Sequence, residues 1–218
     1  RENSSKNWAT AYDTAAVTEG LINKVEIPHQ RTAGMQAWVF NTRRAIFSDP
    51  QVRRALAYAF NFEWTNENLF YSAYTRTDSF FDNSELGSRG LLSDAGAEER
   101  EILERYRDRL PPELFTEVYV PPVSDKARAA DRNNLRTANE MLTEAGWIVR
   151  DGKRVNAETG EPMNFEILLI SPSFERIALP YSKNLEQLGI DVAVRTVDTS
   201  QYVNRLDEYD FDVVVSSW

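Results

Sequence analysis

Serine hydroxyls are the groups in this 218-residue chain that come nearest to a nucleophile. Ser171, Ser216 and Ser217 each follow an apolar run, where the end of a strand would present them. A serine nucleophile also needs a base beside it. The single histidine, His29, follows Pro28 and lies far in sequence from the three serines, so we expect a packing or surface role for it. A hydrolase-like enzyme stays open as an alternative, without an identified base.

Acidic pairs and phosphate loops give no stronger indication of catalysis. Asp210 and Asp212 stand two residues apart and would share one face of a strand, whereas paired catalytic acids come from different elements. The chain has no cysteine, hence no thiolate nucleophile or zinc-thiolate site. It also lacks the glycine-rich loops that hold phosphates in nucleotide enzymes. The sequence therefore predicts no catalytic residue, no metal site and no cofactor.

Side chains suited to recognition are more numerous, and many lie in the stretch "TRTDSFFDNSELGSRGLLSDAG" at 75–96. A loop of this length is uncommon unless it serves a function. Aromatic rings can cover a ligand while polar groups fix its orientation. For each residue the alternative is an aromatic ring in the core or a polar turn former. The candidate ligand-binding residues are Asn41, Tyr74, Arg76, Asp78, Phe81, Asn83, Glu85, Ser216, Ser217 and Trp218.

The last third of the chain must position several of these groups. Strands are predicted at 164–170, 191–198 and 210–218, with helices at 173–189 and 200–209 between them. Such alternation predicts parallel strands joined by right-handed crossovers. In an open α/β sheet, ligands bind beyond the carboxyl ends of the strands. Those ends are predicted at Asn41 and Thr42, Ile170 and Ser171, Asp198, and 216–218.

Earlier elements complete an α/β domain with a mixed, mainly parallel sheet flanked by helices. A strand is predicted at 34–42 because both of its faces are apolar. Asp49 as cap and Pro50 at the first position predict a helix, and Asp131 and Gly146 bracket another. Asp151 and Gly152 predict a hairpin turn.

Further elements carry weaker patterns. We expect a short edge strand at 24–27, a helix at 64–74, and an exposed helix at 98–110. The inner side of that exposed helix is predicted to hold Ile102, Leu103, Tyr106 and Leu110.

Composition limits the class of partner. Hydrophobic residues make up 42% and charged residues 27%, an ordinary globular balance, and no apolar run approaches the ~20 residues that cross a bilayer. The formal charge of −9 argues against binding a nucleic-acid polymer, which needs a concentrated basic surface. Paired arginines such as Arg43 and Arg44 are expected to be solvated.

An ordered set of motifs resembles one family. "WVFNTRRAIFSDPQVRRALAYAFNFEW" resembles the segment of the family 5 extracellular solute-binding proteins in which an F-N-T strand precedes an F-x-D-x-x-V-R-x-A-L-x-x-A helix. "LTEAGW", "LEQLGIDVAVRTVD" and "YDFDVVVSSW" are similar to later landmarks in the same order. "TRTDSFFDNSELGS" is similar to the branch of the oligopeptide and microcin C binding proteins.

The resemblance implies a type II periplasmic-binding-protein fold, in which two hinged lobes enclose a ligand and deliver it to an ABC permease. It divides the chain into a lead-in at 1–33 and a second ligand-binding lobe at 34–218, the first lobe lying elsewhere in the protein. It implies a periplasmic, non-enzymatic, monomeric receptor for peptides or peptide-like compounds. A ligand sensor of the same fold stays an alternative. Trp218 matches a tryptophan that lies against the bound peptide in oligopeptide-binding relatives.

Overall fold

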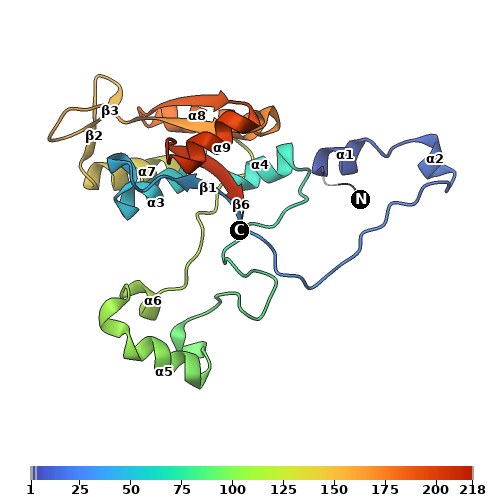
Figure 1. The fold of residues 1–218 in the computed structure, drawn as a ribbon, viewed down its shortest axis with the longest axis horizontal. Coiled ribbons are helices and arrows are strands. Elements are labelled where there is room, and N and C mark those ends of the chain that lie inside the picture. Colours follow the sequence, from blue (N-terminus) through green and yellow to red (C-terminus); the bar gives the residue numbers. More distant parts are fainter. Residues whose placement is uncertain (1, 3, 218) are drawn as a thin grey trace. The chain divides into compact units, whose positions relative to one another are not determined.

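The computed structural model describes residue 2 and residues 4–217, and this part of the chain divides into two compact units (Figure 1). The sheet unit contains the stretch up to Glu26, Ala37–Thr75 and Pro122–Ser216. The loop unit contains Ile27–Gln36 and Arg76–Pro121, together with Ser217. Trp218 lies outside the described residues, so its predicted role stays a prediction. The lobe boundary predicted at 33/34 also stays a prediction.

A four-stranded sheet in the order β1-β6-β4-β5 forms the centre of the sheet unit. Its strands are β1 (Gln36–Phe40), β4 (Asn164–Leu169), β5 (Asp191–Thr196) and β6 (Val213–Ser217). Strand β4 pairs in parallel with both β5 and β6, as predicted. The Asn41 N–H, just after β1, donates to the Asp212 carbonyl, just before β6, at 2.9 Å. Strand β1 therefore runs opposite to its neighbour β6, and the sheet is mixed.

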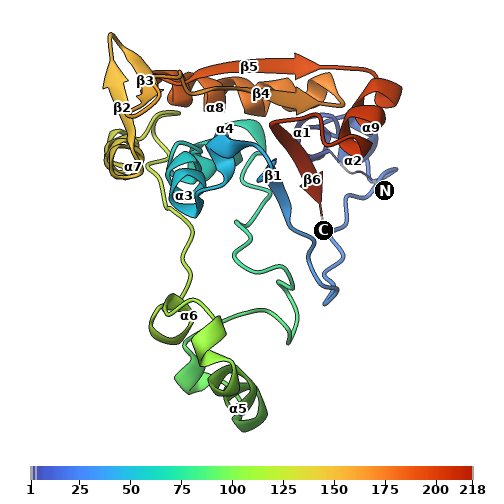
Figure 2. The ribbon, with the colours of Figure 1, turned by 60° about the vertical axis from the view of Figure 1, so that its left-hand side comes forward.

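Helices cover both faces of this sheet (Figure 2). On one face lie α3 (Pro50–Tyr58), α7 (Arg132–Glu144) and α8 (Glu175–Gln187), and on the other lies α9 (Thr199–Asp207). Each face of the sheet has its own hydrophobic core, and alternate residues of β4 contribute to the two cores. Phe165 and Ile167 pack with α3, α7 and α8, and Leu168 packs with Tyr202 of α9. Because successive strand side chains point to opposite faces, the continuous apolar run of β4 fits a strand covered on both sides.

The predicted helix caps are confirmed. Asp49 accepts a hydrogen bond from the Gln51 N–H at 2.7 Å, and Pro50 occupies the first position of α3. Asp131 accepts bonds from the backbone of Asn133 and Asn134 at the start of α7. Burial alone would raise the pKa of Asp131, but the backbone N–H groups that it accepts from hold that pKa below its usual value.

The predicted hairpin is present as β2 (Trp147–Arg150) and β3 (Lys153–Asn156), with Asp151 and Gly152 at φ of 50° and 75° in the turn. Its anchor is the buried Arg154. This guanidinium donates to the Leu188 carbonyl at 2.9 Å, the Trp147 carbonyl at 3.0 Å and Asn139 Oδ1 at 2.6 Å. Burial without a carboxylate partner lowers the pKa of Arg154. The backbone of Arg154 also lies against Gly189: its N–H donates to the Gly189 carbonyl at 2.7 Å, and a Cβ on Gly189 would lie only 2.8 Å from the same backbone nitrogen.

Two weaker predictions differ from the structure. Residues 24–27 form neither helix nor strand, and the stretch before them folds as the short helices α1 (Ser5–Thr10) and α2 (Ala15–Thr18). Helix α4 (Phe62–Leu69) ends before residue 74, because Tyr71 and Ser72 take left-handed φ values of 56° and 57°.

The loop unit contains α5 (Ala97–Arg105) and α6 (Glu113–Thr116) with irregular chain around them. The loop unit also contains 3₁₀ turns at Leu92–Asp94 and Arg107–Arg109, and the sheet unit contains others at Ala45–Phe47 and Pro172–Phe174. The predicted inner side of α5 is wrong in part, since Ile102 and Tyr106 are exposed and Leu103 and Leu110 are half-buried. Local pairs such as Arg105 with Glu101, 2.8 Å apart, support this helix instead.

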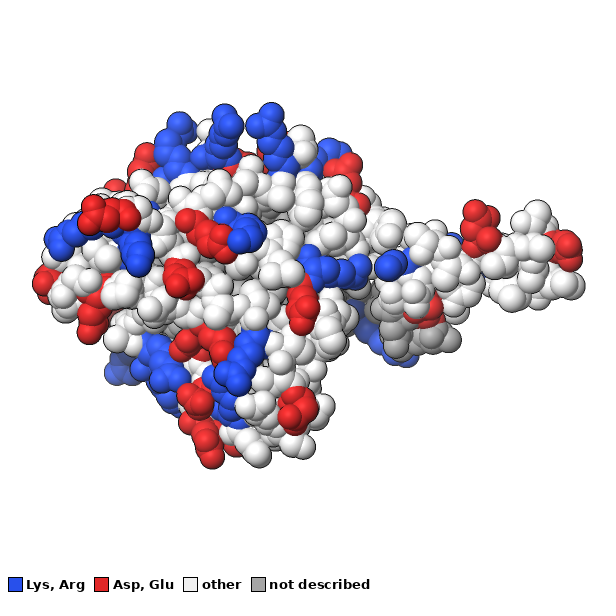
Figure 3. All heavy atoms as spheres, turned by 90° about the horizontal axis from the view of Figure 1, so that it is seen from above, with Lys and Arg blue, Asp and Glu red and all other residues white. Residues whose placement is uncertain are grey.

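Charges of both signs are interspersed on the face that Figure 3 shows. Exposed pairs such as Lys183 and Glu186, whose atoms are 2.8 Å apart, contribute little to stability because water screens them. Among the described residues, none of the helices combines the length and apolar character required to span a bilayer.

Candidate functional site

The carboxyl ends of the parallel strands meet at one edge of the sheet unit. We define this carboxyl edge by Ile170 and Ser171 after β4, Thr196 at the end of β5, and Ser216 in β6. Ile170 is exposed although it is a large apolar residue. Ligands of open α/β sheets bind at this kind of edge, which makes it the first candidate site.

The polar groups of the carboxyl edge are partly used in local structure. Ser171 Oγ accepts from the Ser173 N–H at 3.3 Å and lies 2.9 Å from Ser173 Oγ. The Thr196 hydroxyl donates to Glu175 at 2.6 Å. These bonds fix the loop between β4 and α8, and Ser171 caps the 3₁₀ turn rather than facing a histidine.

An aromatic turn, residues 70–74, follows α4 beside the start of α8. Phe70 and Tyr74 meet edge to face with centroids 4.8 Å apart. The Asn66 side chain holds the Tyr74 backbone on both sides, accepting from its N–H at 3.0 Å and donating to its carbonyl at 2.7 Å. The guanidinium of Arg176, the second residue of α8, lies 5.7 Å from the Phe70 ring centroid. Tyr74 is thus a predicted site residue that the structure places near α8.

The start of β6 is held by a different cluster, which we call the latch: Asn41, Arg44, Asp210 and Asp212. The Asn41 amide donates to the carbonyls of Tyr209 at 2.9 Å and Phe211 at 2.8 Å. Arg44 pairs with Asp210 at 3.0 Å and Asp212 at 3.2 Å. Asn41 is only 3% exposed. The asparagine of the F-N-T motif therefore binds the backbone of the Y-D-F-D motif, which gives the two motifs a common structural role.

The sequence prediction that groups Asn41 with Ser171 and Ser216 at one edge is wrong. Strand β1 runs against β6, so the end of β1 lies beside the start of β6, while Ser216 is near the end of β6. Both N–H groups of the Asn41 amide bind carbonyls, and its oxygen accepts from the Arg43 N–H at 3.1 Å. Asn41 positions β6 and is not available to a ligand at the carboxyl edge.

The remaining predicted residues belong to the loop unit. Asn83 is a turn former with φ of 60°, and its amide donates to the carbonyls of His29 and Arg31. Phe81 is 52% exposed and Asp78 and Glu85 are exposed. Arg76 is half-buried, and Ser217 is exposed at the last described position. The Asn83 side chain therefore binds residues 29–31 to the turn that contains Asn83.

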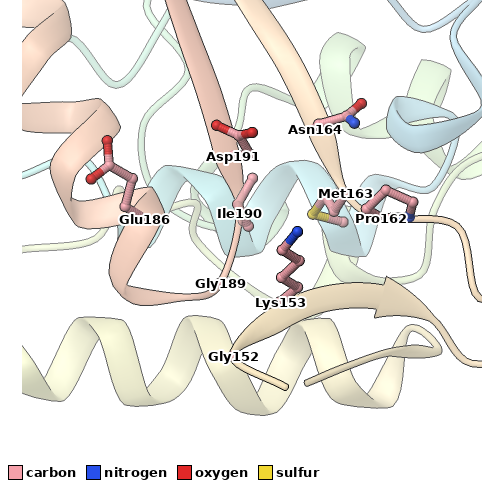
Figure 4. A pocket seen from close by; sticks show the side chains of 9 residues that line it. All are labelled: Gly152, Lys153, Pro162, Met163, Asn164, Glu186, Gly189, Ile190 and Asp191. Atoms are coloured by element: carbon pink, nitrogen blue, oxygen red, sulfur yellow. The ribbon is translucent and has the colours of Figure 1, made fainter. Parts of the chain in front are cut away.

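A shallow pocket lies at the opposite end of β4 and β5 from the carboxyl edge (Figure 4). Lys153 reaches from the hairpin toward the starts of the two strands at Asn164 and Asp191. Gly189 and Met163 also line this pocket. This position is away from the strand ends where such sheets bind ligands.

The sequence analysis did not single out Phe70 and Arg176, which the structure brings together. The signal available for Arg176 was its place two residues after "SPSF", the segment that follows a strand, and for Phe70 its place at the end of an amphipathic helix. Neither position indicated that the two side chains would meet, because 106 positions separate 70 from 176. The contact between α4 and α8 in the fold brings the two residues together.

Comparison with known proteins agrees with this architecture. The chain is 48% identical over 220 residues to "Uncharacterized protein y4wM" of Sinorhizobium fredii, and 46% identical over 220 residues to "Probable peptide-binding protein YejA" of Agrobacterium fabrum. All of this chain matches in both, but it spans only 33% and 35% of their lengths.

A solved structure shares the fold. The oligopeptide-binding protein AppA of Bacillus subtilis, in complex with a nonapeptide, superposes with a TM-score of 0.62 at 18% identity, over 86% of this chain and 31% of AppA. This supports the predicted type II periplasmic-binding-protein fold. The sequence model of the "Bacterial extracellular solute-binding proteins, family 5 Middle" matches residues 2–218. The chain therefore belongs to the family 5 extracellular solute-binding proteins.

Proposed function

We propose that this chain is a ligand-binding lobe of an ABC-importer receptor that captures peptides or peptide-like compounds outside the cytoplasm and delivers them to a membrane permease. The observation that carries the proposal is the family match across residues 2–218. The A. fabrum relative, at 46% identity, is named as a probable peptide-binding protein, and AppA holds a nonapeptide on the same fold. Because this chain spans about a third of such relatives, the remaining lobe is proposed to lie outside it.

The chemistry of the carboxyl edge supports a receptor rather than an enzyme. The Ser171 hydroxyl caps the 3₁₀ turn by accepting from the Ser173 N–H, and the nearby Glu175 carboxylate accepts from the Thr196 hydroxyl. Nucleophilic catalysis requires a base in hydrogen-bond contact with the nucleophile. Exposed aromatic rings and an exposed guanidinium are recognition groups instead.

The proposed ligand contacts are the predicted candidates other than Asn41 and Asn83, whose amides bind backbone carbonyls. Each remaining residue is a proposal for the intact receptor. They are Tyr74, Arg76, Asp78, Phe81, Glu85, Ser216, Ser217 and Trp218.

A tryptophan-fluorescence titration of the intact receptor tests the proposal. The panel contains short peptides, peptide-nucleotide conjugates, free nucleotides and sugars. We expect a saturable response to the peptide class that Trp218→Phe removes. Trp147→Phe is the matched control, because Trp147 begins the hairpin and lies outside the proposed contacts, so it should leave the response in place. A response only to sugars or free nucleotides would overturn the peptide proposal.

A further inference from the structure

Helix α5 of the loop unit presents an apolar stripe to solvent. Ile102 in the helix and Tyr106 at its C-cap are four positions apart, so their side chains lie next to each other on one face. Ile102 is 53% exposed and Tyr106 is 45% exposed. We call these two side chains the α5 stripe. The apolar periodicity of the sequence predicts that this side of the helix is buried, and this chain leaves it open.

The loop unit as a whole buries little apolar surface. Among its described residues, Leu92 is the only large apolar side chain that is buried. The extended segment after α6 adds Val118, Tyr119 and Val120, which are consecutive and all exposed. Apolar side chains gathered on the surface of a soluble protein mark a place where something else binds. The loop unit is therefore a candidate interaction surface.

Polar contacts orient α5 without using the stripe. The Arg100 guanidinium donates to the carbonyls of Ser93 and Ala95, both at 3.0 Å, and so joins the start of α5 to the 3₁₀ turn before it. After the helix, the Arg107 guanidinium lies 3.9 Å from the centroid of the Phe115 ring in α6.

The length of α5 requires a cover for the stripe. The helix has nine residues. Helices shorter than about 12–15 residues are marginal in water, and most helical stability in proteins comes from packing an amphipathic face. A partner that covers the face only now and then would leave the helix unsupported for the rest of the time. The covering surface must therefore be present throughout the life of the folded protein.

Charge and length decide between the surfaces that could do this. The ranges 27–36 and 76–121 of the loop unit hold seven basic and eleven acidic residues, a formal net charge of −4, so two copies of the unit would repel each other. A permease would contact the receptor only during delivery. This chain spans only 33% and 35% of two close relatives, and a surface in the same molecule has a high effective concentration.

We propose that the α5 stripe packs against the lobe of the receptor that lies outside this chain. The facing surface is apolar at its centre and carries basic residues at its rim, because α5 surrounds the stripe with an excess of glutamates over arginines. The loop unit thereby joins the two lobes through side-chain packing. This inference rests on the proposed receptor function, which assigns the remaining lobe to the part of the protein beyond this chain.

Amide hydrogen exchange in the purified intact receptor tests the proposal through the sign of one effect. Alanine is a better helix former than isoleucine, so on an open face Ile102→Ala would leave the exchange of the α5 amides unchanged or slow it. On a covered face it removes packing, and we expect these amides to exchange about tenfold faster or more. Glu101→Ala is the matched control, since it loses only the exposed pair with Arg105 and should change the exchange by about threefold or less.

A photo-crosslink identifies the covering surface. Tyr106→p-benzoylphenylalanine keeps an aromatic ring in the stripe and needs no loss of packing. Irradiation of the intact receptor should link this position, within one molecule, to residues outside the 218 residues of this chain. Links between two molecules would assign the stripe to a second copy, and links only to residues of this chain would assign it to the sheet unit. Either result would overturn the proposal.

The outcomes also separate this inference from the function on which it rests. Exchange that Ile102→Ala slows or leaves unchanged would refute the interlobe contact, and a peptide titration of the same preparation would still read the receptor function. The expected exchange and crosslinks in a receptor that does not respond to peptides would support the contact and refute only the peptide class of ligand.

Discussion

The two ends of strand β6 differ in how their polar groups are used. At its start, the latch engages every polar side chain: Asn41 binds two carbonyls, Arg44 binds two carboxylates, and Asp212 also accepts from the Glu166 N–H at 3.0 Å. At the carboxyl edge Ile170 is exposed. In the aromatic turn beside α8 Tyr71 is exposed, and the Arg176 guanidinium lies 5.7 Å from the Phe70 centroid without an ion pair among the described residues.

The contrast separates architecture from recognition. A buried polar group must have partners, because leaving it unsatisfied costs its desolvation. Once its donors are used it cannot also bind a ligand, which is the case for Asn41. Exposed groups held in place but not fully bonded can exchange water for a ligand at lower cost. Evolution of new specificity should therefore act on the carboxyl edge while the latch stays unchanged.

The largest effect that the contrast predicts is at the latch. Replacing Asn41 with Ala removes the amide donor of the Tyr209 carbonyl and leaves the Phe211 carbonyl with only the 3.4 Å bond from Arg44 Nε, in a buried site. We expect the free energy of unfolding to fall by about 2–3 kcal/mol. Urea denaturation followed by circular dichroism measures this loss.

Asn83→Gly is the control for that experiment. Asn83 also donates to two carbonyls, but it is exposed, so water replaces its bonds, and glycine keeps the left-handed φ of 60° without strain. Its loss should stay below about 1 kcal/mol. Equal losses in the two variants would mean that burial does not distinguish the latch.

The second prediction concerns the charges of the latch. Arg44→Met removes pairs with Asp210 and Asp212 while keeping an apolar side chain of similar length. Because the Arg44 side chain is 43% exposed, solvent screening limits the loss to about 1 kcal/mol at low salt. The loss should shrink further in 1 M NaCl, where the Debye length is about 3 Å. A loss that is independent of salt would show that Arg44 acts by packing.

Local chemistry in the sequence was enough to predict most elements of the sheet unit. The caps at Asp49 and Asp131 and the turn at Asp151-Gly152 depend on residues within a few positions of each other. The parallel strands follow from the alternation after residue 164, because crossovers restrict the topology. The resemblance to family 5 then supplied the class of fold.

Long-range pairing was not predictable in the same way. The Asn41 amide binds carbonyls 168 and 170 positions away, and nothing local in "FNT" indicates that partner or the direction of β1. Buried Asn184 likewise donates to the carbonyls of Ala59 and Ala129. In α5 the apolar periodicity predicted an inner face, yet Ile102 is exposed within the described residues. Periodicity indicates which face could be buried but not what covers it.

The third prediction probes β6 between its two ends. Tyr202 of α9 donates its hydroxyl to the Val215 carbonyl at 3.2 Å, and burial raises the pKa of this phenol. Tyr202→Phe should lower the free energy of unfolding by about 0.5–1 kcal/mol at pH 8. Above about pH 10 the unfolded phenol ionises before the folded one, so the parent loses this stability as pH rises through the raised pKa. The gap between parent and variant should therefore narrow with pH, and a constant gap in denaturation curves at pH 8 and 10.5 would contradict the raised pKa.

The smallest change in stability is predicted at the aromatic turn. Tyr71 holds a left-handed φ of 56° and is exposed, so Tyr71→Gly relieves strain of about 1 kcal/mol. The added freedom of glycine in the unfolded chain offsets most of that gain. The net change in the free energy of unfolding should be within about 0.5 kcal/mol of zero, measured by urea denaturation. Ser72→Gly should behave alike, because Ser72 has φ of 57°.

Only the tyrosine variant removes a ring beside the proposed peptide site, so it alone should weaken peptide binding. A large loss of stability in Tyr71→Gly would place the turn with the latch, as architecture, and would remove the reason for assigning recognition to the carboxyl edge.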